Sequence, residues 1–215
     1  MAHVKPDNYK RFLKMFSDLK GIDLLIADLN GVLRGKRIQS SALAKVFQEG
    51  IYLPASVFAG DITGATVEET GLGMAQGDSD RVCHPIPHTL SKSPWYNKSM
   101  AQVLMTMYEA NGKPFFADPR QVLKRIFGQF QELGFTPVVA VELEFYLLDI
   151  RRDREKYPQP PISPVTGKRD KNTQVYSVDD LDDYGEFLDR VAKGAESQGI
   201  PADTALAEYA PGQFE

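Results

Sequence analysis

A near-continuous apolar run with two glutamates inside it constrains the fold of this chain more than any other feature. The run extends from Pro137 to Leu148 and places Glu142 and Glu144 two positions apart. An apolar run of this kind is typical of a buried strand, and we expect a long strand over residues 135–149. Because side chains alternate across a strand, both glutamates are predicted to point to one face, roughly 6.5–7 Å apart along it.

Two carboxylates side by side among apolar residues are unfavourable, because desolvation and mutual repulsion both oppose their ionisation. Bound divalent cations would compensate, since such cations prefer carboxylate oxygens. The alternative is a solvated face on which Glu142 and Glu144 are ordinary surface residues. Val138 and Ala140 share that face, which argues against full solvation. From this feature alone, a metal or catalytic site and a plain surface both remain open.

A second acidic cluster lies at the end of the chain. Glu208 and Glu215 flank Pro211-Gly212, a dipeptide that favours a turn. Taken in isolation, the cluster is either a surface hairpin with incidental acids or the second part of a site that includes Glu142 and Glu144. Its spacing by itself does not decide between the two.

The first 110 residues predict a strand-rich α+β module with few helices. The Asn30-Gly31 dipeptide between two apolar or alternating runs is a strong hairpin signal, since both residues tolerate positive φ. Five glycines among acidic residues predict a loop over 59–80. The expected strands are 22–28, 32–38, 51–58, 81–86 and 101–108, and the expected helices are 8–20 and a second one that Ser40 or Ser41 caps and Gly50 ends.

The pattern changes at Asn111-Gly112, which predicts a turn and a domain boundary. Asp118 is an expected helix N-cap, Pro119 takes the first helical position, and Gly134 ends this helix. Further along, a proline-rich stretch over 151–173 predicts an exposed loop. A helix capped by Ser177 is expected to run to about Gly199, and a final strand begins near Ala205. These boundaries suggest an N-terminal helix over 1–20, a domain over 21–112 and a second domain over 113–215.

Composition excludes several classes of protein. The net charge is −4 and no long basic stripe is present, which argues against a nucleic-acid partner. Cys83 is the single cysteine, so no internal disulfide can form, and its apolar flanks predict a buried strand residue. The chain shows neither a signal peptide nor an apolar run of the roughly 20 residues that a membrane helix needs. We therefore expect a cytoplasmic protein.

Three phrases along the chain form a specific combination: Asp28-x-Asn30-Gly31-x-x-Arg34-Gly35-Lys36, then Gly112-x-Pro114-x-x-x-Asp118-Pro119-Arg120-x-x-Leu123, and then Glu142-Leu-Glu144 with Glu208-x-x-Pro211-Gly212-Gln213-x-Glu215. Together they resemble the glutamine synthetase superfamily, and the resemblance spans the chain from about residue 20. The longer wordings around residues 139–149 and 201–203 are similar to its γ-glutamylpolyamine branch, the γ-glutamylputrescine synthetases. The implied fold is α+β, with an N-terminal β-grasp-like domain followed by the first, incomplete part of a catalytic domain with an antiparallel sheet flanked by helices.

The resemblance also implies site residues. Glu144, Glu208 and Glu215 match the ligands of one Mg²⁺ or Mn²⁺ ion, and Glu142 matches a ligand of a second ion beside the nucleotide. Asp61, in the stretch Phe58-Ala-Gly-Asp-Ile-Thr63, is the candidate for the family's aspartate near the amine. Asp61 is displaced from the expected position, which fits an amine larger than ammonium, and a turn role for it remains open.

The implied activity is ATP-dependent joining of the γ-carboxylate of glutamate to an amine through γ-glutamyl phosphate. A polyamine such as putrescine is the expected acceptor. A true glutamine synthetase that uses ammonia and a non-catalytic structural or regulatory relative are the alternatives. Family members are homo-oligomers that assemble as double rings and are about twice as long as this chain. The 215-residue chain by itself is therefore expected to be inactive.

Overall fold

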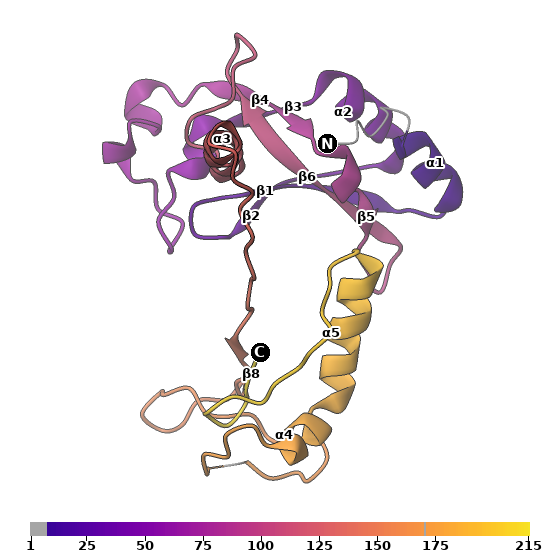
Figure 1. The fold of residues 1–215 in the computed structure, drawn as a ribbon, viewed down its shortest axis with the longest axis vertical. Helices are drawn as coiled ribbons and strands as arrows, with labels where there is room; N and C mark the ends of the chain where they lie inside the picture. Colours follow the sequence, from indigo (N-terminus) through magenta and orange to yellow (C-terminus); the bar gives the residue numbers. More distant parts are fainter. Residues whose placement is uncertain (1–7, 170) are drawn as a thin grey trace. The chain divides into compact units, whose positions relative to one another are not determined.

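A computed structural model describes residues 8–169 and 171–215 of the chain (Figure 1). The fold is mixed α+β, as predicted, and it divides into two compact units: the first ends at Pro137 and the second comprises Val138–Glu215. The predicted division into 1–20, 21–112 and 113–215 stays a prediction about domains. Residues 1–7 of its N-terminal segment lie outside the described residues.

The first unit is built on a six-stranded sheet in the order β2-β1-β6-β4-β3, with β5 paired to β6. Pairing is parallel between β1 and β6 and antiparallel between the other neighbours. All five predicted strands are present, although the third ends early and gives way to a 3₁₀ turn. The strands are β1 (Gly21–Ala27), β2 (Leu33–Ile38), β3 (Ile51–Pro54), β4 (Asp80–Pro85), β5 (Ser91–Lys92) and β6 (Met100–Tyr108).

Helices and 3₁₀ turns complete this unit, and the two predicted helices of its N-terminal half are confirmed. The first is shorter than expected, since it ends at Met15. Ser40 and Ser41 form a 3₁₀ turn before the second helix and make no side-chain capping bond. The elements are α1 (Asn8–Met15), α2 (Leu43–Glu49), η1 (Ser40–Ala42), η2 (Ala55–Phe58), η3 (Glu68–Thr70), η4 (Met74–Gln76) and η5 (Pro87–Thr89).

The predicted hairpin joins β1 and β2 through a five-residue loop, Asp28–Val32, rather than a two-residue turn. The buried carboxylate of Asp28 accepts hydrogen bonds from the backbone of Asn30 at 2.8 Å and Val32 at 2.9 Å, and from Arg34 Nε at 3.1 Å. Burial raises the pKa of Asp28, but these bonds outweigh it and lower the pKa overall. The loop conformation therefore depends on an ionised Asp28.

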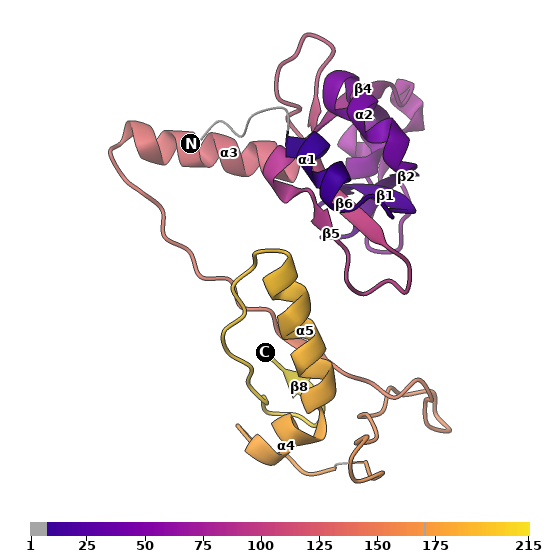
Figure 2. The ribbon, with the colours of Figure 1, turned by 90° about the vertical axis from the view of Figure 1, so that its right-hand side faces the viewer.

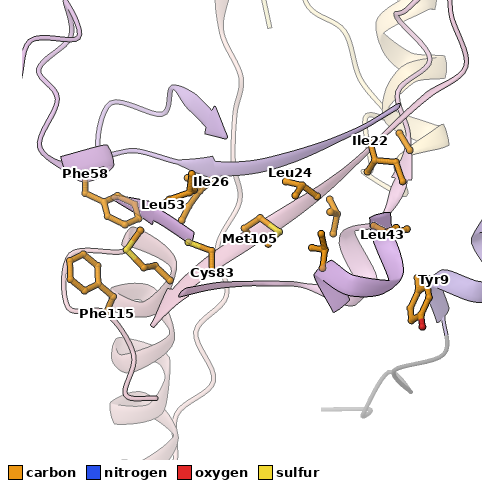
Figure 3. Close-up of a cluster of buried hydrophobic side chains, with 14 of the residues drawn as sticks. Tyr9, Ile22, Leu24, Ile26, Leu43, Leu53, Phe58, Cys83, Met105 and Phe115 are labelled. Atoms are coloured by element: carbon orange, nitrogen blue, oxygen red, sulfur yellow. The ribbon is translucent and has the colours of Figure 1, made fainter. Parts of the chain in front are cut away.

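The core lies where β1, β4 and β6 meet α2. Figure 3 shows Ile22, Leu24 and Ile26 of β1 in one cluster with Met105 and Cys83, all of them at most 2% exposed. Alternate residues of β1 face this core, which is the two-residue period expected of a half-buried strand. Burial raises the pKa of the Cys83 thiol to about 12, so Cys83 is the inert core residue predicted from its neighbours.

Helix α3 (Pro119–Glu132) confirms the predicted capped helix, and Figure 2 shows it as one continuous helix. Asp118 accepts from the Arg120 amide at 2.8 Å, as an N-cap should. Its second oxygen accepts from the Thr106 hydroxyl at 2.8 Å and the Met107 amide at 2.7 Å. Because Asp118 is 1% exposed, this buried cap attaches the start of α3 to strand β6.

In the second unit the prediction of a long strand over 135–149 is wrong. Only β7 (Phe145–Tyr146) is a strand, and it pairs with β8 (Gln213–Phe214). Val138 is 94% exposed and Ala140 is exposed as well, so the face shared by the two glutamates is not apolar and buried. A strand is stabilised by backbone hydrogen bonds to a neighbouring strand. Among the described residues, the segment 135–149 has a paired strand beside it only at β7.

The predicted helix after Ser177 is two helices, α4 (Val178–Asp183) and α5 (Gly185–Ser197), which Figure 2 shows as separate segments. The break falls at Tyr184, where φ is −112° and ψ is 15°. Ser177 caps α4 as predicted, since its hydroxyl accepts from the Asp180 amide at 3.2 Å. The predicted final strand is reduced to β8 and an isolated bridge between Ala207 and Phe214.

Candidate functional site

Pairing of β7 with β8 brings two of the candidate glutamates together. Phe145 lies opposite Phe214 in the antiparallel register. Glu144 precedes the first of these residues and Glu215 follows the second. Extending the register by one residue therefore places Glu144 opposite Glu215.

Aromatic packing stabilises this pair of short strands. Phe214 is 1% exposed, and its ring lies 6.2 Å from that of Phe145 and 5.3 Å from that of Tyr184, measured between centroids. Phe145 also packs edge-on against Phe187 of α5 at 5.9 Å. The junction between α4 and α5 therefore supports the two short strands that Glu144 and Glu215 flank.

The bend at Pro211-Gly212 places Glu208 on the neighbouring backbone segment. The backbone of Glu215 exchanges two hydrogen bonds with Leu206, at 2.9 and 3.0 Å, and the Glu208 amide donates to the Gln213 carbonyl at 2.8 Å. The two glutamates thus belong to the two arms of one turn, as the turn signal predicted.

Gln213 connects the bend to Glu144. Its side-chain oxygen accepts from the Ala210 amide at 2.8 Å, and its side-chain nitrogen donates to the Glu144 carboxylate. Sequence reasoning assigned no role to this residue. The signal for it was its position inside the phrase Pro211-Gly212-Gln213.

Gly212 occupies a position that only glycine fits. Its φ is +79°, and an added Cβ would lie 2.5 Å from Pro161 Cδ and 2.8 Å from the Leu147 carbonyl oxygen. The Leu147 amide also donates to the Gly212 carbonyl at 2.7 Å. The bend therefore packs closely against both Pro161 and the segment after β7, which leaves no room for a side chain at position 212.

The carboxyl group of Glu215 responds electrostatically to the other three candidate glutamates. Its pKa is raised, first by loss of solvent around the carboxyl group and then by the negative charge of Glu142. A hydrogen bond with Glu208, the charge of Glu208 and the charge of Glu144 act in the same direction. Backbone pairing thus places Glu144, Glu208 and Glu215 on neighbouring segments, and the charge of Glu142 acts on the same carboxyl group.

Four clustered carboxylates are a donor set that suits a hard divalent cation, because its charge would offset their repulsion. In their present arrangement they are not gathered as a coordination shell. Among residues 8–169 and 171–215, no group of three or more His, Cys, Asp or Glu side chains lies close enough to hold a metal ion. The chemistry of the set fits such an ion, while binding requires the side chains to close around it.

Asp61 lies in the first unit, and its carboxylate closes its own loop. One oxygen accepts from the Thr63 amide at 2.8 Å, the Thr63 hydroxyl at 2.7 Å and the Ala65 amide at 3.0 Å. The bond from the Thr63 side chain is the main cause that lowers the pKa of Asp61. The turn role considered for this residue is therefore present, and the other carboxylate oxygen takes no part in these three bonds.

Comparison with known proteins identifies the class that this fold and site define. Residues 116–215 match the family model described as "Glutamine synthetase, catalytic domain". Over 98% of its length the chain also superposes on a solved structure titled "GmaS/ADP complex-Conformation 1", with a TM-score of 0.71 and 19% identity, covering 43% of that chain. At this identity, the likeness shows the fold alone.

Among curated proteins, the chain is 48% identical over 206 residues to gamma-glutamylputrescine synthetase PuuA of Escherichia coli (strain K12), covering 96% of this chain and 43% of that relative. It is 29% identical over 221 residues to glutamate–isopropylamine ligase of a Pseudomonas species, covering 97% and 46%. The chain belongs to the glutamine synthetase superfamily. It spans less than half the length of these relatives.

One further expectation concerns membranes. None of the helices in the part of the chain that the structure describes has the length and hydrophobicity required to cross a bilayer.

Proposed function

We propose that the protein is an ATP-dependent ligase that joins the γ-carboxylate of glutamate to an amine, with an alkyl polyamine such as putrescine as acceptor. The observation that carries the proposal is the pairing of β7 with β8, which places Glu144 opposite Glu215, with Glu208 on the other arm of the same turn. The 48% identity to an enzyme named for γ-glutamylputrescine supports the reaction class and the acceptor.

The four glutamates have two roles in this proposal. Glu144, Glu208 and Glu215 would hold one Mg²⁺ or Mn²⁺ ion, and Glu142 would help to hold a second. When bound, such ions would neutralise and orient the phosphates of ATP. In the proposed reaction the glutamate γ-carboxylate attacks the γ-phosphate, which forms γ-glutamyl phosphate and releases ADP. A neutral amine then attacks the carbonyl carbon of the acyl phosphate, phosphate leaves, and the nitrogen loses a proton as the amide forms. Gln213 would orient Glu144 through their hydrogen bond.

Asp61 is the proposed acidic residue for the amine. Its lowered pKa keeps the carboxylate negative at neutral pH, which is the charge needed to attract a protonated amine. The hydrogen bonds that Thr63 and Ala65 donate to one oxygen of Asp61 fix the orientation of the carboxylate. An amine donor would meet the oxygen outside these bonds.

The arrangement of the first unit supports two finer assignments. Its sheet, in which a hairpin of β1 and β2 is followed by α2 and then by β3, β4 and β6, is proposed to be a β-grasp-like domain over residues 21–112. The chain after residue 112 is proposed to open the catalytic domain. Homo-oligomeric assembly with sites shared between neighbours is proposed on the same family grounds.

Titration with Mn²⁺ tests the metal site directly. We expect Glu144→Ala and Glu208→Ala to weaken Mn²⁺ binding at least about tenfold, because each removes a charged ligand. Glu196→Ala, at an exposed position of α5, is the matched control and should bind as the wild type does. Equal affinity in all four proteins would refute the metal assignment.

The acceptor is tested by phosphate release from ATP, catalysed by the complete protein, in the presence of glutamate and competing amines. Putrescine is expected to support faster turnover than ammonia or isopropylamine at equal concentration. Preference for ammonia would identify a true glutamine synthetase instead. Glutamate-dependent turnover that no amine stimulates would remove the ligase proposal.

A further inference from the structure

The proline-rich segment after β7, predicted to be an exposed loop, is folded between residues 159 and 169. Ile162 and Arg169 form an antiparallel bridge, and the Ser163 amide donates to the Lys168 carbonyl at 2.8 Å. Ser163 is only 3% exposed, and its side-chain hydroxyl oxygen accepts a hydrogen bond from the Val165 amide at 3.1 Å. Residues 159–169, here named the 159–169 hairpin, therefore form a small structure of their own.

Arg169 connects this hairpin to Asp149, in the segment that follows β7. Its guanidinium donates from Nη2 to the Asp149 carboxylate and from Nε to the Pro160 carbonyl at 2.9 Å. Asp149 also donates from its amide to the Gln159 carbonyl at 2.9 Å. The Asp149 carboxyl has a lowered pKa, caused first by the Arg151 amide and, against some burial, by the charge of Arg169. Asp149 is thus a stable anion that holds Arg169.

The hairpin in turn supports the bend of the carboxylate cluster. Pro161 follows the residue that Arg169 binds, and its ring atoms Cδ and Cγ lie 2.5 and 2.8 Å from where a Cβ on Gly212 would be. Gly212 separates Glu208 from Glu215 along the chain and bonds to Leu147 through its carbonyl. A continuous series of contacts therefore runs from Arg169 through Pro160 and Pro161 to the bend.

We propose that Arg169 is a positioning residue of the metal site: by holding Pro161 against Gly212 it fixes the spacing between the Glu208 and Glu215 arms and the segment that carries Glu144. This inference rests on the proposed function, since it assumes that the four glutamates bind a divalent ion. Ligands that must close around an ion depend on a bend of fixed geometry, and residues that orient ligands commonly contribute about 10–100-fold to metal affinity.

The test compares Mn²⁺ affinity, measured from free Mn²⁺ by electron paramagnetic resonance, with thermal unfolding of the same variants. Arg169→Met removes both side-chain bonds and should weaken Mn²⁺ binding about tenfold while a cooperative unfolding transition is retained. Arg169→Lys keeps the positive charge beside Asp149 but lacks the forked donor group, so its affinity should lie between those of the wild type and Arg169→Met. Arg154→Met, an exposed arginine of the preceding loop, is the control and should leave the affinity unchanged.

Comparison with Glu144→Ala distinguishes failure of the inference about Arg169 from failure of the proposed metal site. If Glu144→Ala loses Mn²⁺ but Arg169→Met binds it as the wild type does, the inference about Arg169 is overturned and the metal site stands. If Glu144→Ala also binds as the wild type does, the proposed metal site fails and the inference fails with it.

A second variant covers the case in which Arg169→Met does not fold. Pro161→Ala removes the ring atoms that face Gly212 and leaves the partners of Arg169 in place. We expect it to weaken Mn²⁺ binding several-fold. Unchanged affinity in a folded Pro161→Ala protein would overturn the inference.

Discussion

The side-chain amide of Gln213 donates a hydrogen bond to the carboxylate of Glu144, sixty-nine residues earlier in the chain. The same amide group accepts from the Ala210 backbone at 2.8 Å, so one side chain joins the β7 segment to the bend. Glu144 and Glu215 are adjacent in the extended β7–β8 register. A neutral donor at position 213 therefore lies beside clustered negative charges, where it partly satisfies one of them.

Replacing this donor by an anion tests that relationship. Gln213→Glu keeps an acceptor for Ala210 but loses the bond to Glu144 and adds a like charge, so the free energy of unfolding at pH 7 should fall by more than the roughly 1 kcal/mol of a lost hydrogen bond. The additional loss should disappear below about pH 4.3, where an ordinary glutamate is protonated. Urea unfolding at pH 7 and at pH 4 measures this. Gln213→Met, which adds no charge, should show no such pH-dependent recovery.

Gly212→Ala is expected to lower the free energy of unfolding more than the same change at Gly167, another glycine with positive φ. Gly212 and Gly167 have φ of 79° and 68°, but an added Cβ meets nothing within 4 Å at Gly167, whereas at Gly212 it meets Pro161 and Leu147. Left-handed alanine costs about 1–2 kcal/mol, so Gly167→Ala should lose about that much stability. Gly212→Ala should lose at least about 1 kcal/mol more. Chemical denaturation measures both losses, and equal losses would contradict the close packing at the bend.

The clash expected in Gly212→Ala is partly with the ring of Pro161, which a second substitution can remove. In a Pro161→Ala background the ring atoms nearest to the added Cβ are absent, so Gly212→Ala should cost less than in the wild type. Denaturation of the two single variants and the double variant gives the coupling energy. Additive losses would show that Pro161 and Gly212 do not interact.

Asp118→Ala should destabilise the first unit by roughly 2–4 kcal/mol, because it removes a helix cap and leaves the buried Thr106 and Met107 donors without their acceptor. Ser177→Ala provides the comparison, since Ser177 caps α4 with a single bond of 3.2 Å. That variant should lose about 1 kcal/mol. Thermal unfolding of each measures the difference, and a similar small loss at both sites would contradict the second role of Asp118 in anchoring α3 to β6.

The stability of the protein is predicted to depend on pH through Asp28, the buried carboxylate in the loop between β1 and β2. Its pKa is lower in the folded protein than in the unfolded chain, so its stabilisation is fully present above an unfolded value of about 3.9. It is lost as the pH falls through the folded pKa. The stability difference between the wild type and Asp28→Asn should therefore be largest near pH 7 and shrink in acid. Urea unfolding from pH 7 down to pH 2.5 measures it, and a difference that grows in acid would contradict the assigned direction.

Local signals predicted the first unit well. The Asn30-Gly31 hairpin, the strands around Cys83 and Met105 and the capped helix after Asp118 all formed where the residues indicated. Each depends on interactions between near neighbours or on alternation within one strand. The wrong prediction was the strand over 135–149, because an apolar run shows what a segment could bury and not whether a partner strand is present.

The sequence by itself indicated the candidate residues of the proposed site: Glu142, Glu144, Glu208 and Glu215 are recognisable from their phrases, because acid pairs and a proline-glycine turn are local patterns. Tertiary structure alone decided how their segments meet, through the pairing of Phe145 with Phe214 and the packing of Pro161 in the 159–169 hairpin against Gly212. No local pattern encodes these contacts, since each joins residues about fifty to seventy positions apart, and their energy comes from packing that exists only once both segments have folded together.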